Sequence, residues 1–320
     1  MSRHHAHPPH FPPPLADFGG APPPAPDWFR DALADAPERL EVKVQGAPVE
    51  ALAWGRRGDP GLLLLHGNGA HADWYAHIGP LLKAGRRVVA MSFSGMGGSG
   101  WRTHYSVAQW ADEAVAVAEA TGLYDAPVLP TVAGHSFGGF PLMNAADRHG
   151  DRLARAVIVD TPARPPSRVA AQQQRAQAPR SDAMRSARVY PSVTEALLRF
   201  RLMPPQGCPH PCVADLIARR GLKQVVGPDG APGWVWRFDP FLFRHFDFGR
   251  PYSHLRRARC SVTLVRGGRS RLLSVEAFQR MAEYAPPGTA LAEVPDADHH
   301  VMIDQPLAFA ALLDGLAPRA

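Results

Sequence analysis

Short apolar runs alternate with stretches of helix length along most of this chain. Residues 62–65 and 156–159 are continuous apolar runs, which are typical of strands buried on both faces of a sheet. Residues 87–93 and 261–265 have a similar character, and stretches of helical character lie between most of the runs. Strands that alternate with helices in this way predict an α/β fold, in which a mostly parallel sheet carries helices on both faces.

The beginning of the chain has a different pattern. Apolar and polar positions alternate at period two in residues 40–44 and 49–54, with a Gly- and Pro-containing turn between them, so we predict an antiparallel hairpin. Residues 1–27 are rich in Pro and His and lack the apolar content that a core requires. We therefore predict that this segment is a disordered arm.

The alternation of strands and helices is interrupted after residue 162. Residues 163–256 are rich in Pro, Arg and Gln, and they contain two helical patches and an aromatic run, residues 234–241. We interpret this segment as a mainly helical cap, inserted into a core made of residues 28–162 and 257–320. An insertion at the carboxyl edge of the sheet would cover the crevice where α/β sheets bind ligands. We expect the aromatic side chains mostly to fill the cap's own small core.

A short glycine-rich motif lies between a predicted strand and a predicted helix. The sequence Gly134-His135-Ser136-Phe137-Gly138 follows the apolar run 128–132 and precedes a stretch of helical character. In a G-x-S-x-G turn of this kind the serine hydroxyl projects above the sheet, and the two glycines allow the strand and the helix to approach closely. Ser136 is therefore a candidate nucleophile, and the alternative is an ordinary glycine-rich turn.

A serine hydroxyl is a poor nucleophile near neutral pH, so Ser136 requires a histidine base and an acid that orients the histidine. Asp160 directly follows the strand after the Ser136 helix, and His299 and His300 follow the last predicted strand. The residues alone do not separate the two histidines. The chain order of serine, aspartate and histidine is the order expected when these groups meet at one edge of an α/β sheet.

Backbone N–H groups that face the developing negative oxygen form the oxyanion hole of such a site. One is expected from Phe137, the residue after the nucleophile. The other is expected from the loop His66-Gly67-Asn68-Gly69, which follows the strand 62–65, and Asn68 is the candidate donor.

Composition narrows the class of partner. The net charge is +6, but no block of basic residues is interleaved with aromatic residues, so no nucleic-acid partner is expected. No apolar run reaches the length of a membrane span. Cys208, Cys212 and Cys260 are too few for a disulfide framework and odd in number, which is consistent with a reducing, cytoplasmic location.

Two further motifs resemble cofactor or metal sites. Residues 94–100 contain the spacing G-x-G-x-x-G, but no helix follows directly, which argues against a dinucleotide site. The sequence Cys208-Pro209-His210-Pro211-Cys212 has prolines that stiffen it and no second Cys/His pair nearby, so we interpret its cysteines as ordinary thiols. We therefore expect neither a cofactor nor a metal ion.

Taken together, these motifs resemble the α/β-hydrolase superfamily, in particular its capped branch of epoxide-hydrolase-like and ester-hydrolase-like proteins. The resemblance covers residues 40–316 and includes the ending 298–306, which is similar to the family's G-H-x-x-x-x-D-x-P. It implies a mostly parallel eight-stranded sheet flanked by helices, with the insertion as the cap. It also favours His299 over His300 as the base, and it implies that Asn68 and Phe137 supply the oxyanion hole.

The sequence departs from the family pattern at two positions near this site. Asp298 stands where the family usually has the glycine before the histidine, and Arg271 stands in the loop where the family's acid is often found. That loop carries no carboxylate, which favours Asp160 as the acid. Asp239 in the cap is the reserve candidate.

The type of nucleophile narrows the chemistry. Epoxide hydrolases and haloalkane dehalogenases of the superfamily use aspartate at the elbow, so Ser136 argues against both activities. We predict a serine hydrolase that acts on a small-molecule carboxylic ester through an acyl-enzyme. The alternatives are a carbon–carbon bond, lactone or amide hydrolase on the same scaffold, and a non-catalytic ligand-binding protein.

Overall fold

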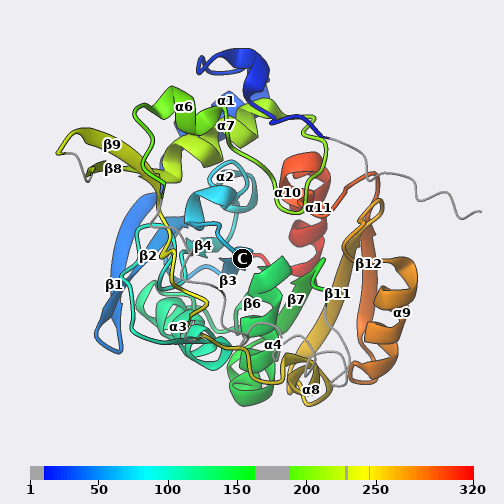
Figure 1. Cartoon of the computed structure of the whole chain (residues 1–320). Helices are drawn as coiled ribbons and strands as arrows, with labels where there is room; N and C mark the ends of the chain where they lie inside the picture. Colours follow the sequence, from blue (N-terminus) through cyan, green and yellow to red (C-terminus); the bar gives the residue numbers. More distant parts are fainter. Residues whose placement is uncertain (1–10, 163–187, 228–229, 245) are drawn as a thin grey trace, which may run out of the picture.

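The computed structural model describes residues 11–162, 188–227, 230–244 and 246–320. Its centre is an eight-stranded sheet, with the strands in the order β1-β2-β4-β3-β6-β7-β11-β12 (Figure 1). Only β2 runs antiparallel to its two neighbours, so the predicted fold class, a mostly parallel α/β sheet, is confirmed. The strands are β1 (Glu38–Val44), β2 (Ala47–Trp54), β3 (Gly61–Leu65), β4 (Arg87–Met91), β6 (Thr131–His135), β7 (Arg155–Val159), β11 (Ser261–Gly267) and β12 (Ala290–Val294).

The two faces of the sheet carry separate apolar cores. Within β3, Leu63 packs in one core with Trp110, whereas Leu64 packs in the other with Ile78, which explains why the whole strand is apolar. The first core is covered by α3 (Val107–Ala120), α4 (Gly139–Arg148), α8 (Pro251–Arg256) and α9 (Val275–Tyr284). The second is covered by α1 (Asp27–Ala34), α2 (Gly79–Leu82), α10 (Val301–Asp304) and α11 (Pro306–Leu316).

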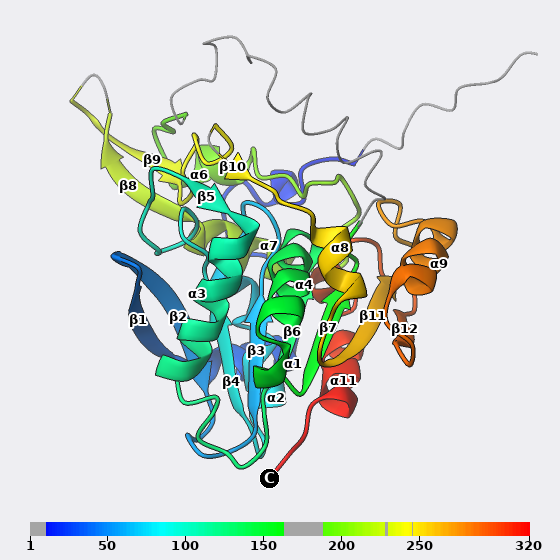
Figure 2. The same ribbon diagram turned by 90° about the horizontal axis from the view of Figure 1, so that it is seen from below.

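The described part of the predicted cap lies beyond one edge of the sheet (Figure 2). It contains α6 (Val193–Leu197) and α7 (Pro211–Arg220), but also an antiparallel hairpin of β8 (Leu222–Val226) and β9 (Pro232–Trp236). The hairpin differs from the expected helical character. Alternating exposure in β9, where Val235 is buried and Trp234 is half-buried, shows that its aromatic run follows strand periodicity.

Two short backbone pairings are among the contacts that join the cap to the core. The strand β10 (Phe246–Asp247) pairs in parallel with β5 (Tyr105–Ser106), and Met96 in the loop after β4 forms a bridge with Phe238. The helix α8, at the end of the predicted cap, packs against α4 in the first core. Residues 163–187, which the sequence analysis assigns to the cap, lie outside the described residues.

Part of the predicted disordered arm is packed against the cap. Leu15 is buried against Leu197, Ala214 and Ala218, and Arg219 donates a hydrogen bond to the carbonyl of Gly20. Leu15, with Phe18 packed against the same cluster, contacts both α6 and α7, and the composition of the arm does not reveal this. Across the described part of the chain, none of the helices has the length and apolar character needed to cross a membrane.

Candidate active site

Ser136 lies directly after β6, at the sharp turn that the sequence predicts. Its backbone has a φ of 51°, in the left-handed region that a residue with a side chain rarely adopts. A Cβ atom on Gly134 would lie 2.5 Å from the carbonyl oxygen of Gly138, so the strand and the following turn approach as closely as glycine permits. The hydroxyl of Thr161 donates a hydrogen bond of 2.9 Å to the carbonyl of Ser136 and supports this turn.

His299 stands between Ser136 and Asp160. Its Nε2 lies 2.9 Å from Oγ of Ser136, and its Nδ1 lies 2.7 Å from Oδ2 of Asp160. Both His299 and Asp160 are buried, with side chains 1% and 0% exposed. The neighbouring His300 makes no hydrogen bond with either partner, so the structure brings His299, and not His300, into contact with the serine. This is the arrangement of a nucleophile, a general base and an orienting acid.

Asp160 is held by the loop that follows β11. The N–H of Gly267 donates to Oδ1 at 2.9 Å, and the hydroxyl of Ser270 donates to Oδ2 at 2.6 Å. This is the loop where the family's acid is often found, and here it supplies hydrogen-bond donors to an acid carried by the neighbouring strand β7. The reserve candidate Asp239 lies elsewhere, since its carboxylate accepts hydrogen bonds from Tyr105 and from the N–H of Phe241.

The two predicted oxyanion donors lie beside Ser136. A Cβ atom on Gly67 would be 3.3 Å from Cβ of Ser136, which brings the Asn68 loop next to the nucleophile. Phe137 is in the first turn of the short helix η3 (Ser136–Gly138). A first-turn N–H has no acceptor within its own helix, so the N–H of Phe137 is available to a ligand.

Buried charges and hydrogen bonds also hold the loop that carries His299. The N–H of His299 donates to Asp298 at 2.8 Å, and the N–H of Asp298 donates to Asp304 at 2.7 Å. Burial raises the pKa of Asp304 to about 6, because a charged carboxylate is poorly solvated there. Asp298 and Asp304 lie within the ending 298–306, but the sequence does not show their hydrogen bonds. Ser270 and Thr161 are not found by sequence reasoning, since no spacing rule links them to Ser136.

Three histidine rings cluster next to Ser136. One ring nitrogen from each of His135, His299 and His300 lies within 4.8 Å of the others, and this is the group in the described residues that could hold a metal ion. Burial, followed by the proximity of His299, keeps the pKa of both His135 and His300 well below the ordinary value. Their rings are therefore neutral near pH 7. Both nitrogens of His299, however, already face Ser136 and Asp160.

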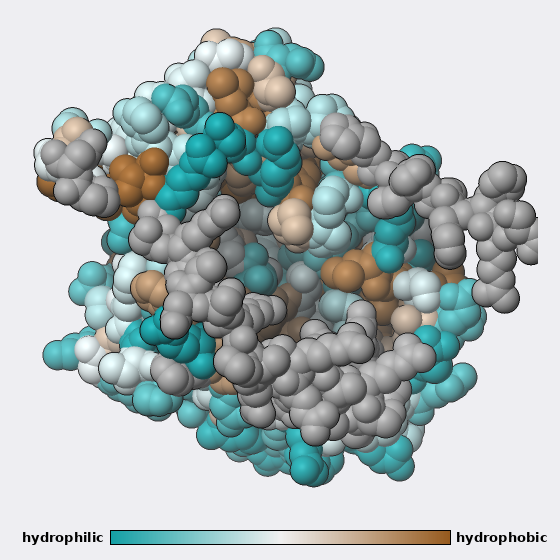
Figure 3. Space-filling view, in the orientation of Figure 1, coloured by the Kyte–Doolittle hydropathy of each residue, from teal (hydrophilic) through white to brown (hydrophobic). Residues whose placement is uncertain are grey.

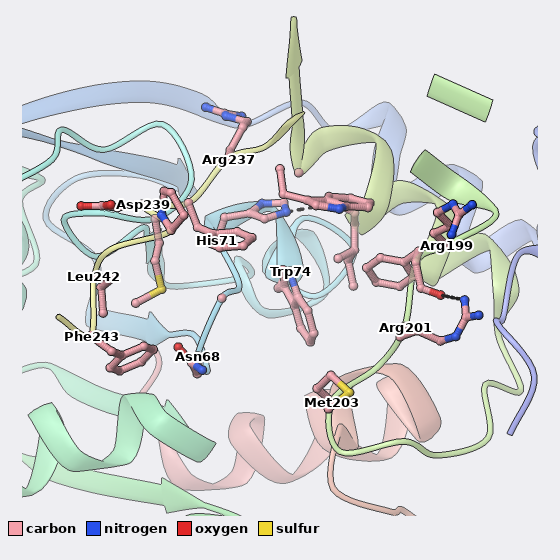
Figure 4. Close-up of a pocket in the computed structure, with 18 of the residues that line it drawn as sticks. Asn68, His71, Trp74, Arg199, Arg201, Met203, Arg237, Asp239, Leu242 and Phe243 are labelled. Atoms are coloured by element: carbon pink, nitrogen blue, oxygen red, sulfur yellow. Dashed lines mark hydrogen bonds between the residues drawn. The ribbon is translucent and has the colours of Figure 1, made fainter. Parts of the chain in front are cut away.

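A pocket of about 400 Å³ opens between the cap and the core. Its lining includes Asn68 and His300, apolar side chains such as Trp74 and Leu242, and the charged side chains of Arg199, Arg201, Arg237 and Asp239. Figure 4 shows Trp74 pointing into the cavity, with Leu242 and Phe243 on one side and Met203 on the other. In the space-filling view, both apolar and hydrophilic side chains border the hollow between the cap and the core (Figure 3).

Comparison with known proteins identifies the family. Residues 62–312 match the profile of the Alpha/beta hydrolase family, which is more than half of the chain. The chain belongs to this family. The predicted family and the prediction that the protein is an enzyme are thereby confirmed.

Two relatives show how far the similarity extends. Esterase Rv0045c of Mycobacterium tuberculosis is 27% identical over 278 residues, which cover 86% of this chain and 88% of that protein. A solved structure of that esterase matches with a TM-score of 0.65 and 24% identity, over 94% of this chain and 95% of that chain. The thioesterase domain from the curacin biosynthetic pathway matches with a TM-score of 0.69 and 21% identity, over 87% and 99%. At this identity the two structures show a shared fold.

Proposed function

We propose that this protein is a serine hydrolase that cleaves small-molecule carboxylic esters through an acyl-enzyme. The observation that carries the proposal is the hydrogen-bonded series from Asp160 through His299 to Ser136, with links of 2.7 and 2.9 Å. The similarity to a named esterase supports the choice of substrate class.

The reaction follows from the positions of these groups. Nε2 of His299 takes the proton of Ser136 as Oγ attacks the ester carbonyl, and Asp160 stabilises the imidazolium that forms. The negative oxygen of the tetrahedral intermediate faces the N–H groups of Asn68 and Phe137. Collapse of the intermediate breaks the bond to the alcohol, which leaves with the proton from His299. Water, deprotonated by His299, then attacks the acyl-enzyme, releases the acid and restores Ser136.

The pocket indicates the kind of acyl or alcohol group that fits. Its volume is about 400 Å³, and its lining combines apolar side chains such as Trp74 and Leu242 with the guanidinium groups of Arg199, Arg201 and Arg237. Pockets of this size accommodate small organic molecules, and their polar groups mainly set orientation. We infer from the volume a preference for short or medium substituents.

A fluorophosphonate probe with peptide mapping tests the proposal. We expect covalent labelling at Ser136 in the native protein and none in Ser136→Ala. A panel of aryl esters of increasing chain length, with a lactone, an amide and a vinylogous diketone, then measures kcat/KM for each class. Labelling with activity only on the diketone, the lactone or the amide would replace the ester assignment, and absence of labelling would favour a ligand-binding role.

We also propose that transition metals inhibit this enzyme by binding to the histidine cluster. One solved structure of the Mycobacterium tuberculosis esterase concerns transition metal inhibition of that enzyme. In this chain, Nδ1 of His135 and both ring nitrogens of His300 have no hydrogen-bond partner in the described part of the structure. Neutral imidazoles are favoured ligands of Zn²⁺, Cu²⁺ and Ni²⁺. A cation held by these rings and by His299 would remove the base from Ser136.

A further inference from the structure

A buried residue of the cap, Gln206, touches the loop that carries the catalytic histidine. Gln206 is 4% exposed, and its two side-chain atoms reach different parts of that loop. Its Nε2 donates to Oδ1 of Asp304 at 2.8 Å, and its Oε1 accepts the N–H of His300 at 2.8 Å. In Figure 1 this part of the cap, drawn in green, descends beside α10, drawn in red.

A second connection reinforces the first. Arg271 donates to the carbonyl of Pro205 at 3.0 Å, next to Gln206 in the cap. The same guanidinium pairs with Asp298, which accepts the N–H of His299. The consecutive N–H groups of His299 and His300 are therefore both fixed, one through Asp298 and the other directly by the cap.

The carboxylate of Asp304 joins these connections into one network. Its Oδ1 accepts from Gln206, and its Oδ2 accepts the N–H of Asp298, one residue before the base. Loss of the Gln206 amide would leave one oxygen of Asp304 and the N–H of His300 without their buried partners. Unsatisfied buried groups of this kind are costly, so the loop would move to find new ones.

We propose that Gln206 is a positioning residue, through which the docked cap keeps the His299 loop in the register that brings Nε2 to Ser136. This inference rests on the proposed function, because it assigns His299 the role of base. Gln206 does not touch the reacting atoms and acts through the backbone of His300 and through Asp304. Catalysis is sensitive to such placement, since a misplacement of 1 Å can lower a rate by about 100-fold.

The test compares Gln206→Ala and Gln206→Glu in the full chain with matched controls at Gln224, an exposed glutamine on β8. Each protein is assayed for kcat and KM on one aryl ester and for the rate constant of fluorophosphonate labelling. We expect Gln206→Ala to lower kcat and the labelling rate constant by about 10- to 100-fold with little change in KM. A merely structural loss would instead reduce the fraction of protein that labels and leave the rate constant unchanged.

The Gln206→Glu variant is nearly isosteric with the native protein, so its labelling rate at two pH values tests the hydrogen bond to Asp304 directly. At pH 7.5 its carboxylate cannot donate to Asp304, so the labelling rate relative to the native protein should fall. At pH 5 a proton shared by the two carboxylates restores the hydrogen bond, and the ratio should rise. Asp298, Arg271 and Cys208 are the other titratable or charged groups near Asp304, and they are the same in both proteins.

Three outcomes decide between the possibilities. Slow labelling of both Gln206 variants, with recovery of Gln206→Glu at pH 5 and normal Gln224 variants, supports the inference. Rate constants within twofold of the native protein for both Gln206 variants overturn it while the proposed function stands. Failure of the native protein to label at Ser136 contradicts the proposed function itself.

Discussion

The guanidinium of Arg271 lies 2.6 Å from the carboxylate of Asp298. These two residues are also positions near the site where the sequence departs from the family pattern, which often has an acid at the first and usually has a glycine at the second. Asp298 introduces a negative charge directly before His299, and Arg271 neutralises it from the loop after β11. The two departures therefore compensate each other and leave Asp160 as the carboxylate that contacts the ring of His299.

The Arg271–Asp298 pair is expected to show coupling in a double-mutant cycle. Arg271 is 43% exposed, so each of Arg271→Ala and Asp298→Ala should lower the free energy of unfolding by about 1 kcal/mol or less. The double variant should lose less free energy of unfolding than the two single variants lose together. The difference is a coupling of about 0.5 kcal/mol, which decreases at high salt. Urea denaturation at low and high NaCl measures this, and strictly additive losses at both would exclude the coupling.

The features that the sequence predicts are those with a local cause. A buried strand such as β3 requires a continuous apolar run, and this signal is contained within a few consecutive residues. The turn at Ser136 is readable because only glycines permit its close approach. Asp160 and His299 follow from the rule that parallel strands end at one edge of the sheet.

The features that the sequence does not reveal depend on contacts between distant segments. Ser270 is one serine in an arginine-rich loop, and it meets Asp160 only because β7 and β11 are neighbours in the sheet. Gln206 and Leu15 acquire their contacts from the way the cap folds back over the core. The β8–β9 hairpin was not predicted, because a short apolar run in a polar insertion fits a helix or a strand equally well.

Replacement of the acid should separate Asp160 from the reserve candidate. Asp160→Asn keeps the shape but cannot stabilise the imidazolium or fix the tautomer of His299, so we expect kcat to fall by about 10³- to 10⁴-fold. Asp239→Asn should lower kcat by less than about tenfold, because the carboxylate of Asp239 accepts a hydrogen bond from Tyr105 and makes none with His299. Steady-state kinetics on one aryl ester measures both, and the reverse order would reassign the acid.

Removal of the Ser270 hydroxyl should have a smaller effect on the same assay. Ser270→Ala deletes one of the hydrogen bonds to Asp160 but leaves the N–H of Gly267 in place. A hydrogen bond to a charged group contributes about 1.5 to 3 kcal/mol, of which a part reaches the transition state, so we expect a loss of about 3- to 30-fold in kcat. An effect as large as that of Asp160→Asn would argue that Ser270 does more than hold the acid.

The backbone at Ser136 should make glycine more stabilising than alanine there. Both Ser136→Gly and Ser136→Ala remove the nucleophile, but only glycine adopts a φ of 51° without strain. We expect the free energy of unfolding of Ser136→Gly to exceed that of Ser136→Ala by about 1 kcal/mol. Ser253, within the helix α8, provides the control. There the Ser253→Gly variant should be less stable than the Ser253→Ala variant. Equal stability at Ser136 would contradict the strain.

The buried carboxyl of Asp304 should make stability depend on pH. Its pKa is raised from 3.8 to about 6, so between these values the folded protein binds a proton that the unfolded chain has released. The contribution of Asp304 to stability therefore increases as the pH falls from 7.5 to 5, by about 1 kcal/mol. Urea denaturation at both pH values should show this increase in the native protein relative to Asp304→Asn, in which the group cannot titrate. An identical pH dependence of the two proteins would rule out the raised pKa.

The histidine cluster should make the enzyme sensitive to Zn²⁺ and Cu²⁺ but not to Mg²⁺, which prefers oxygen ligands. A cation reaches the cluster through the pocket, because His300 lines its wall. Binding would draw the lone pair of His299 away from Ser136, so metal should slow both ester turnover and fluorophosphonate labelling, and EDTA should restore both.

Removal of one ligand in His300→Gln should raise the metal concentration for half-inhibition by about tenfold or more, measured relative to that variant's own activity. Cys208 and Cys212 are free thiols that also bind such metals, so the double variant Cys208→Ser/Cys212→Ser is the matched control. Loss of inhibition in the cysteine variant, with no change in His300→Gln, would move the metal site away from the catalytic histidine.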